Sequence, residues 1–436
     1  MSNKKMTQVF IPGKNWILSL AELAAFLEAR DREFEIEVFS KAFFVVSVKN
    51  AGVDVAELGG IIKIGDVRAN LATQTVKETF LQKNKQAQAQ IKSALLSRDI
   101  VDGMFETPSS GKAVFGVSVY WGDSTLRPVA KIIQRFIGSA VKKELATLGK
   151  RANFMGFAKD REYPQLSHVE VLKKSMIENK AEVLFCAGKE QTFVAITRAV
   201  HNPFEFQKRD VGKPSQRKIF AIPPRLARIM INLASCTEGK VLLDPFCGVG
   251  TILQEAMLAK AKVVGVDINR WCVEAARRNL EWLKSEYSLE NAEYRVLQGD
   301  VHRLSQKIGR EQVDCIATEP DLGPALRQVP TTPYAARIIG RLEPLYQGFL
   351  EEAFKVLRSD GRLVLVSPFV KTRSGKPVTM RIEDKAAEMG FKRVQLLQRG
   401  VFAENIVAPE SLTTMTSFVD TDERHLIGRE IHVFQK

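Results

Sequence analysis

The segment Lys240-Val-Leu-Leu-Asp-Pro-Phe-Cys-Gly-Val-Gly-Thr251 decides the fold class. It has the pattern of an apolar strand that ends on an acid, followed by a short glycine turn and the start of a helix. A doubly wound α/β sheet builds a cofactor crevice in this way. A second apolar run, Lys262-Val-Val-Gly-Val266, ends on Asp267, which follows Asp244 by 23 positions (267 − 244). This is about the spacing at which an acid reaches a ribose, so the segment predicts a nucleotide-like cofactor.

The glycine turn separates two classes of cofactor. A dinucleotide turn has the pattern G-x-G-x-x-G, which presents bare backbone to a pyrophosphate. Here no third glycine follows Gly248 and Gly250, and Asp244 would repel a diphosphate but attract an ammonium group. The run Asp-Pro-Phe-Cys-Gly-x-Gly-Thr resembles the first motif of class I S-adenosylmethionine-dependent methyltransferases. The resemblance implies an S-adenosylmethionine pocket whose residues here include Asp244, Phe246, Gly248, Gly250 and Thr251.

Strands and helices alternate from Lys240 onward, which predicts a parallel sheet with helices on both faces. This is a Rossmann-like α/β domain, which we expect over residues 223–436. Its last two strands are expected to form an antiparallel pair. The expected strands are 241–243, 262–266, 294–298, 314–318, 362–366, 392–397 and 430–434, and the expected helices are 251–260, 271–284, 342–357 and 382–388.

The first half of the chain has a different pattern. A strand, an amphipathic helix and two strands, at 8–12, 19–28, 35–39 and 43–48, predict a small α+β unit. A polar run at 83–90 is expected to be a solvated helix or connector. Further on we expect a strand at 113–120, a basic helix at 128–148 and a strand pair at 182–186 and 192–197. A charged segment with proline and glycine, 208–218, is typical of a linker.

Composition limits the function classes. The 436 residues contain 45% hydrophobic and 26% charged residues, no apolar run long enough for a membrane span and no secretory signal, so we expect a cytoplasmic protein. The five cysteines form no C-x-x-C pair and the histidines no ligand spacing, so we expect buried free thiols and no metal. Residues 1–220 contain 34 Lys and Arg against 23 Asp and Glu, a net +11 of the total +14. A polyanionic partner engaged by the first half is expected.

Three carboxylates follow successive strands of the predicted sheet: Asp244, Asp267 and Asp300. Cofactor crevices lie at the carboxyl ends of such strands. One acid can therefore face the methionine moiety, one the ribose hydroxyls and one the adenine edge. The residues after the last two acids, Ile268 and Val301, are expected to enclose the purine.

The fourth strand runs into Glu319-Pro-Asp-Leu-Gly-Pro324. This resembles the Asp/Asn-Pro-Pro-aromatic motif of enzymes that methylate exocyclic amines of nucleobases. In those enzymes the acid or amide side chain and the first proline's carbonyl orient the amine, and an aromatic stacks on the splayed base. The resemblance implies a catalytic motif at Glu319, Pro320, Asp321 and Leu322, although Asp321 replaces the second proline and Leu322 the aromatic. Stacking could then fall to Tyr334, Phe369 or the first half of the chain.

The order of segments along nearly the whole chain resembles the tRNA guanosine-10 N2-methyltransferases. Further resemblance lies in Pro12–Glu22, Lys208–Pro214 and Pro224–Ala234. It implies a ferredoxin-like segment at 1–65, a THUMP-type RNA-binding domain at 66–203, a linker at 204–222 and the methyltransferase domain at 223–436. We expect an S-adenosylmethionine-dependent enzyme that forms N2-methylguanosine in tRNA, with a small activating subunit as a further partner in some relatives. Another base amine in tRNA or rRNA, including adenine N6, and a catalytically silent RNA-binding factor remain alternatives.

Overall fold

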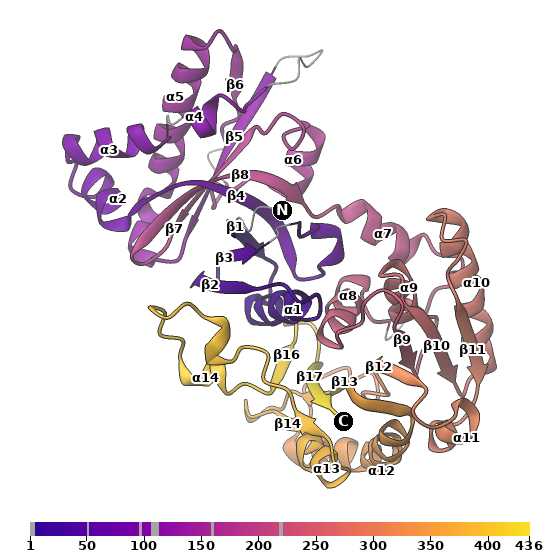
Figure 1. Cartoon of the computed structure of the whole chain (residues 1–436). Coiled ribbons are helices and arrows are strands. Elements are labelled where there is room, and N and C mark those ends of the chain that lie inside the picture. The colour runs from indigo at the N-terminus through magenta and orange to yellow at the C-terminus, as the bar shows by residue number, and fades with distance from the viewer. Residues whose placement is uncertain (1–4, 50–51, 96–97, 106–112, 158–160, 218–220) are drawn as a thin grey trace.

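The chain folds into two lobes that meet along one interface (Figure 1). The computed structural model describes residues 5–49, 52–95, 98–105, 113–157, 161–217 and 221–436. The first lobe contains the residues up to about 200 and the second contains the rest, with α7 (Pro203–Val211) running between them. Lys218, at the end of the expected linker, lies outside the described residues.

One mixed sheet runs through the whole first lobe. Its strand order is β2-β3-β1-β4-β8-β7-β5-β6, and the pairs are antiparallel except for β5 with β7 and β5 with β6. The predicted boundary between residues 65 and 66 falls inside β4, which pairs with β1 on one side and with β8 on the other. The strands are β1 (Lys5–Pro12), β2 (Phe34–Phe39), β3 (Phe44–Lys49), β4 (Ile61–Ala72), β5 (Ala113–Trp121), β6 (Ala152–Phe154), β7 (Glu182–Ala187) and β8 (Gln191–Val200).

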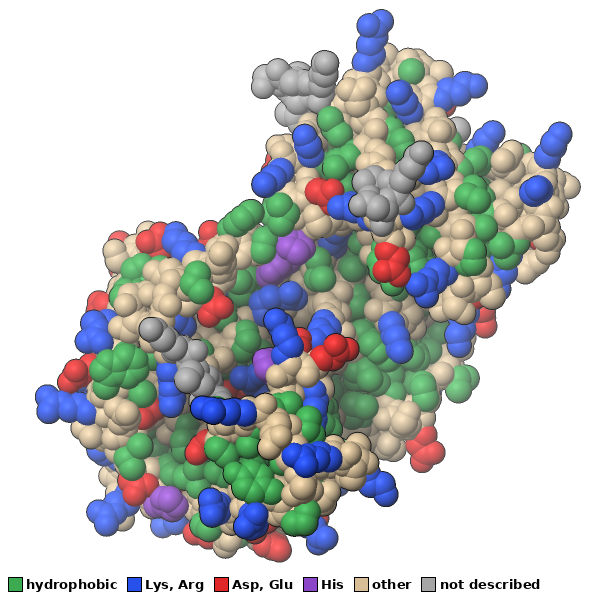
Figure 2. Space-filling model, turned by 180° about the vertical axis from the view of Figure 1, so that it is seen from behind, with side chains coloured by type: hydrophobic (Ala, Val, Ile, Leu, Met, Phe, Trp, Pro, Cys, Tyr) green, Lys and Arg blue, Asp and Glu red, His purple; other side chains and the backbone are tan. Residues whose placement is uncertain are grey.

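The helices of the first lobe pack on this sheet by their apolar sides. In α5, Ile133, Ile137 and Val141 are fully buried, whereas Arg135, Lys142 and Lys143 face solvent. Ile132 is 55% exposed because it lies on the solvent side of the helix. Figure 2 shows Lys and Arg side chains spread over this lobe. The helices are α1 (Trp16–Glu28), α2 (Thr73–Phe80), α3 (Lys85–Leu95), α4 (Arg98–Val101), α5 (Ala130–Thr147) and α6 (His168–Lys173).

The second lobe is a doubly wound α/β sheet, which confirms the predicted fold class. The strand order is β11-β10-β9-β12-β13-β17-β15. The first five strands run parallel, and β17 pairs antiparallel with both β13 and β15. The strands are β9 (Val241–Asp244), β10 (Lys262–Asp267), β11 (Tyr294–Gln298), β12 (Val313–Thr318), β13 (Leu357–Val370), β14 (Val378–Thr379), β15 (Lys392–Arg393), β16 (Ser417–Asp420) and β17 (Ile427–Gln435).

Two elements of the second lobe differ in length from the prediction. The strand expected at 392–397 pairs only over β15, because Leu396 and Leu397 turn into the core instead of continuing along β17. The helix expected at 342–357 begins ten residues earlier (342 − 332), since a proline occupies its first turn. The helices are α8 (Pro224–Leu233), α9 (Thr251–Leu258), α10 (Arg270–Glu286), α11 (Leu304–Ile308), α12 (Thr332–Val356), α13 (Ile382–Glu388) and α14 (Glu410–Thr413).

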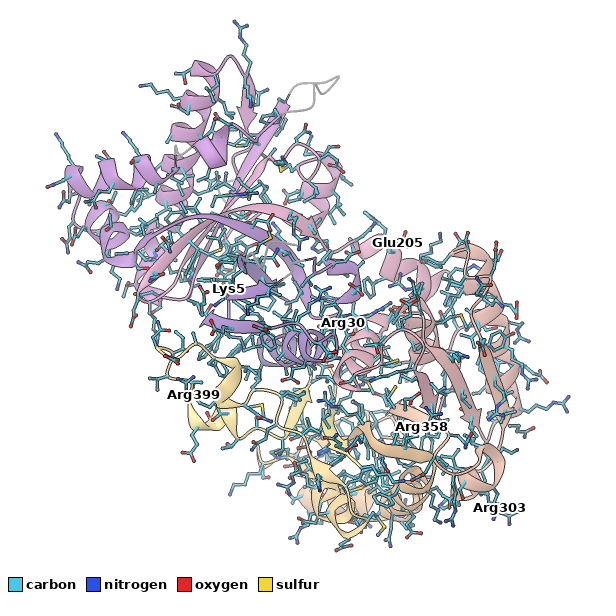
Figure 3. The ribbon with its side chains drawn as sticks, in the orientation of Figure 1. Lys5, Arg30, Glu205, Arg303, Arg358 and Arg399 are labelled. Carbon is cyan, nitrogen blue, oxygen red and sulfur yellow. The ribbon has the colours of Figure 1, made fainter. Side chains whose placement is uncertain are left out.

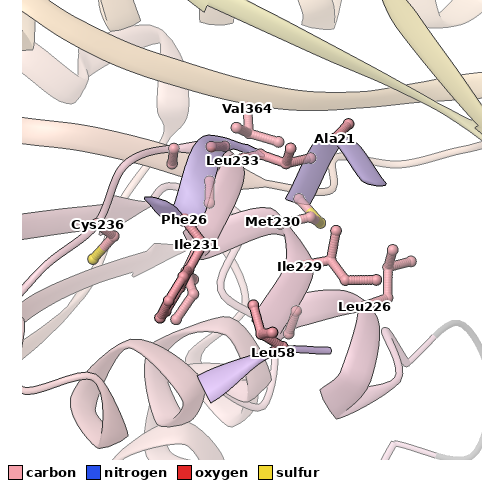
Figure 4. Packing of buried hydrophobic residues seen from close by; sticks show 14 of the residues in the cluster. Ala21, Phe26, Leu58, Leu226, Ile229, Met230, Ile231, Leu233, Cys236 and Val364 are labelled. Atoms are coloured by element: carbon pink, nitrogen blue, oxygen red, sulfur yellow. The ribbon is translucent and has the colours of Figure 1, made fainter. Parts of the chain in front are cut away.

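The two lobes share one apolar core where α1 packs on α8 (Figure 4). Polar contacts fix the same interface. The Glu22 carboxylate of α1 is fully buried and accepts the Gly59 and Gly60 N–H groups, each at 2.7 Å, and the Asn232 amide of α8 at 2.8 Å. Since buried polar groups are costly unless paired, this network locks the relative position of the lobes.

The segment between the lobes is ordered as a helix over much of its length. In α7, Arg209 lies 2.6 Å from the buried Glu255 carboxylate of α9, and Arg228 of α8 contacts the other oxygen of that carboxylate at 2.7 Å. Glu205, labelled between the lobes in Figure 3, accepts the Tyr287 hydroxyl at 2.8 Å. The expected linker is therefore attached to the sheet of the second lobe through α7.

All five cysteines are buried and unpaired, as predicted. Across the described ranges, the helices include none that is long and apolar enough to cross a membrane.

Candidate active site

The turn between β9 and α9 depends on two glycines with positive φ. Gly250 has φ +86°, and a Cβ there would lie 3.2 Å from the Ala276 side chain of α10. Gly248 has φ +51°, and a Cβ there would meet nothing within 4 Å. Both conformations favour glycine. Gly250 therefore allows close packing of α9 on α10. Gly248 leaves open space above the turn.

Asp244 lies at the end of β9, directly under this turn. Its side chain is buried and accepts the Thr318 hydroxyl at 2.6 Å and the Phe246 N–H at 3.2 Å. Burial raises the pKa of Asp244 to about 7, against the lowering effect of these hydrogen bonds, and the nearby Asp267 and Glu319 carboxylates raise it further. The crevice therefore holds a carboxyl group that titrates near neutrality.

Asp267 and Asp300 stand at the ends of β10 and β11, as predicted from their strand-end positions. Asp267 accepts the Gly248 N–H at 2.9 Å and the Asn269 N–H at 2.8 Å, so it is joined to the glycine turn. Asp300 is exposed and accepts the His302 N–H at 3.0 Å, and the hydrogen bonds from His302 lower the pKa of Asp300. The lowered pKa keeps Asp300 ionised at neutral pH.

The two residues expected to enclose a purine differ in exposure. Ile268 follows β10 and is 71% exposed, although it is a large apolar side chain. Val301 follows Asp300 and is buried in the core beneath α12. Phe246 lies partly buried with its ring 5.5 Å from that of Phe349, and Thr251 is buried and accepts the Lys213 ammonium at 2.9 Å. Lys213 thus ties the segment before α8 to the glycine turn.

The loop after β12 lies next to the glycine turn, because β12 pairs with β9. Glu319 begins this loop and forms a two-pronged ion pair with Arg429 of β17. Pro320 is buried, and among the described residues no donor contacts its carbonyl. Asp321 accepts the Gly323 N–H at 2.9 Å, and its own carbonyl accepts the Tyr346 hydroxyl at 3.1 Å. These bonds hold the loop in a fixed shape.

The candidate stacking residues lie on two elements beside the loop. Leu322 packs partly buried against the core, as an aliphatic side chain is expected to do. Tyr334 lies in the first turn of α12 and is 42% exposed. Phe369 lies near the end of β13, opposite Gly428 of β17. That Tyr334 or Phe369 stacks a base stays a prediction.

Four residues of this site were missed by the sequence analysis: Lys213, Thr318, Tyr346 and Arg429. Thr318 ends a predicted strand beside the motif, so the strand-end rule that selected the acids could have selected it. Tyr346 and Arg429 reach the site from distant segments, and no local pattern marks them. Lys213 lies in Lys208–Pro214, a segment that carries the family resemblance but gave no role to this side chain.

Comparisons with known proteins agree with this geometry. Residues 214–391 match the family model described as RMKL-like, methyltransferase domain. The second lobe is therefore similar to a methyltransferase domain over most of its length. A tRNA (guanine(10)-N2)-dimethyltransferase of Methanothermobacter thermautotrophicus is 34% identical over 161 residues, which are 36% of this chain and 42% of the relative. The protein of the same name from Pyrococcus abyssi is 34% identical over 185 residues, 42% of this chain and 50% of the relative. The chain thus spans half or less of these relatives.

The similarity in fold extends over the whole chain. The crystal structure of TrmN from Thermus thermophilus superposes with a TM-score of 0.52 at 17% identity, and the alignment covers 99% of both chains. Both lobes therefore occur together, in this order, in a known fold.

The residues around the glycine turn fit S-adenosylmethionine, the cofactor of this domain class. The open space above Gly248 admits a ligand against the backbone. The carboxylates of Asp267 and Asp300 stand at neighbouring strand ends, where they can accept ribose and adenine donors. The exposed Ile268 offers an apolar surface to a purine. A cofactor with a positive charge and no phosphate matches the acidic crevice.

Gly248→Ala is expected to weaken S-adenosylmethionine binding at least about tenfold, because the new methyl would occupy space that the ligand needs. Gly239→Ala is the matched control, since Gly239 also has a positive φ (+80°) and open surroundings but precedes β9 at its other end. Both variants should lose about 1 kcal/mol of folding free energy through strain. Calorimetric titration and thermal unfolding measure the two effects, and equal affinities in the two variants would contradict a ligand at Gly248.

Asp244→Asn is expected to flatten the pH dependence of cofactor binding. In the native protein, protonation of Asp244 below its pKa of about 7 removes a negative charge from the crevice, so affinity should fall as the pH drops below 7. Because the pKa of Asp244 is raised, the folded protein without cofactor holds this proton up to about pH 7, whereas the unfolded chain releases it at lower pH. The free energy of unfolding should therefore decrease as the pH rises through about 7.

Calorimetric titration of the cofactor and thermal unfolding at pH 5.5 to 8.5 measure these two pH dependences. Asp360→Asn, which changes an exposed acid away from the turn, is the control.

Proposed function

We propose that the chain is an S-adenosylmethionine-dependent methyltransferase that forms N2-methylguanosine in tRNA. The observation that carries the proposal is the position of Glu319 and Pro320. They begin the loop after β12, one strand from the glycine turn. A base amine bound there would lie beside the cofactor crevice. The names of the curated relatives support a guanine amine in tRNA as the substrate.

Glu319 and Pro320 supply the two acceptors that an exocyclic amine needs. The Glu319 carboxylate accepts one N–H and the Pro320 carbonyl accepts the other, which turns the nitrogen lone pair toward the crevice. S-adenosylmethionine supplies an electrophilic methyl group when it is bound. The protein's contribution is orientation and electrostatic stabilisation of the amine as it becomes positively charged. No strong base is required, since the proton leaves an acidic ammonium product.

The first lobe supplies the RNA-binding surface in this proposal. Its excess of positive charge and the solvent-facing Arg135, Lys142 and Lys143 of α5 suit a phosphate backbone. The expected assignment of residues 66–203 as a THUMP-type domain belongs to the same proposal. So does a cytoplasmic location, where tRNA is the available substrate. Affinity for tRNA should then fall steeply with added salt.

The test is incubation of the purified chain with labelled S-adenosylmethionine and an unmodified tRNA transcript, followed by nucleoside mass spectrometry. N2-methylguanosine supports the proposal, and mapping by fragment masses locates the nucleotide. A labelled N6-methyladenosine would replace the guanosine assignment with adenine.

A catalytically silent RNA-binding factor is the second candidate. It is favoured by Asp321 and Leu322, which leave the motif without its second proline and its aromatic. Measurable cofactor and tRNA binding, with no methyl transfer to unmodified tRNA or rRNA even after addition of a cell extract, would support it. Transfer that appears only with the extract would instead indicate an activating subunit.

A further inference from the structure

The Arg429 guanidinium reaches Glu319 from the far side of a neighbouring strand. Arg429 lies on β17 opposite Pro368 of β13, and β13 separates β17 from β12. Its Nε contacts Glu319 Oε2, and its Nη2 lies 3.2 Å from Oε1. Both carboxylate oxygens are therefore held at once, in the planar fork geometry that arginine forms with carboxylates.

The pair is withdrawn from solvent. Only 12% of the Arg429 side chain and 9% of the Glu319 side chain are exposed. Burial acts to lower the pKa of Arg429, but the Glu319 carboxylate outweighs it and the pKa is raised. A surface ion pair would contribute little, whereas removal of one partner here leaves a buried charge.

Acidic side chains lie near both members of the pair. The Asp244 carboxyl is close enough for Glu319 to raise its pKa. Burial, then Glu319 and Asp321, raise the pKa of Tyr346, which packs from α12. Asp420 of β16 acts on Arg429. Without Arg429, Glu319 would be a buried carboxylate near these acids with no guanidinium partner.

Glu319 stands where the motif that it resembles has aspartate or asparagine. Its side chain has one more methylene than aspartate and one more rotatable bond, so its carboxylate is harder to fix. The Arg429 fork removes that freedom. A carboxylate has about four lone-pair sites, and the fork uses two of them, which leaves others to accept an amine N–H.

We propose that Arg429 is a positioning residue, which supplies the counter-charge of Glu319 and fixes its carboxylate as an acceptor for the substrate amine. The proposal rests on the proposed function for its catalytic meaning. It assigns a role to a residue of the antiparallel strand β17, 110 positions after Glu319 (429 − 319).

Arg429→Met is expected to lower kcat about 10- to 100-fold at pH 7, while KM for tRNA and the Kd of S-adenosylmethionine change less than about threefold. Arg424→Met is the matched control, because Arg424 precedes β17 and is exposed. A kcat like the control's, or a loss that lies mainly in KM or Kd, would overturn the proposal.

Arg429→Lys separates charge from geometry. Lysine restores a positive charge but has no fork, so kcat should rise above that of Arg429→Met but stay about fivefold or more below that of the native protein. Full recovery of kcat would show that charge alone is needed and would refute the positioning role.

A measurement without turnover tests the same pair if the native chain transfers no methyl group. At pH 7 the thermal stability of Arg429→Met should lie below that of Arg429→Met/Glu319→Gln, because the single variant leaves a buried carboxylate without its guanidinium partner. Equal stabilities of these two variants would overturn the proposal. An inactive native chain whose variants differ in stability as expected would refute the proposed function alone.

Discussion

Glu319→Ala is expected to lower kcat for methyl transfer at least about 1,000-fold, with the Kd of S-adenosylmethionine changed less than about threefold. The substitution removes one of two acceptors for the amine and leaves the glycine turn and its acids intact. Single-turnover assays on tRNA and calorimetric titration of the cofactor measure the two quantities. Activity within tenfold of the native protein would exclude Glu319 from the reaction.

A second variant controls for the stability of the fold. Glu319→Ala leaves the buried Arg429 guanidinium without its partner, which costs about 3–5 kcal/mol. Glu319→Ala/Arg429→Met removes both charges and should recover most of that stability without recovering activity. Recovery of both would mean that the single variant was inactive only because it unfolded.

Glu255→Gln is expected to lower the free energy of unfolding by about 3–5 kcal/mol, because two buried guanidiniums then lose their counter-charge. Glu255 is fully buried, and its partners Arg209 and Arg228 are 6% and 5% exposed. Chemical denaturation measures the loss. The variant should also release α7 from the catalytic sheet, which faster amide hydrogen exchange in residues 203–211 would report.

An exposed ion pair between α7 and α10 gives the control. Lys208 of α7 and Glu286 of α10 are 40% and 36% exposed, so Glu286→Ala should cost less than about 1 kcal/mol. If Glu255→Gln cost no more than this control, the buried cluster would not be what attaches α7.

The sequence analysis predicted the fold of the second lobe well, because the sequence patterns there are local. The alternation of short apolar runs with amphipathic segments specifies a parallel sheet, and strand-end acids mark one edge of it. Asp244, Asp267 and Asp300 follow three neighbouring strands for this reason. The division of the first lobe was harder to place, since β4 pairs on both sides and no composition change marks residue 65.

The partners of the site residues could not be predicted in the same way. Arg429 meets Glu319 across β13, and Tyr346 meets the loop carbonyl from α12, so both contacts depend on the packed tertiary structure. The pKa of Asp244 depends on burial beneath a turn that brings Thr318 and Asp267 near it. Such properties belong to positions in space and have no pattern along the chain.

The strand order in the sheet of the second lobe has a consequence for synthesis on the ribosome. β15 is translated before β17, yet it pairs with β17, which inserts between it and β13. Glu319 likewise leaves the ribosome 110 residues before Arg429 (429 − 319). The nascent chain can build the first lobe and the parallel strands early, since domains fold as units from the N-terminus. Glu319 reaches its final setting only when β17 is in place, so a second lobe that is still being made has its glycine turn and strand-end acids before Glu319 has its Arg429 partner.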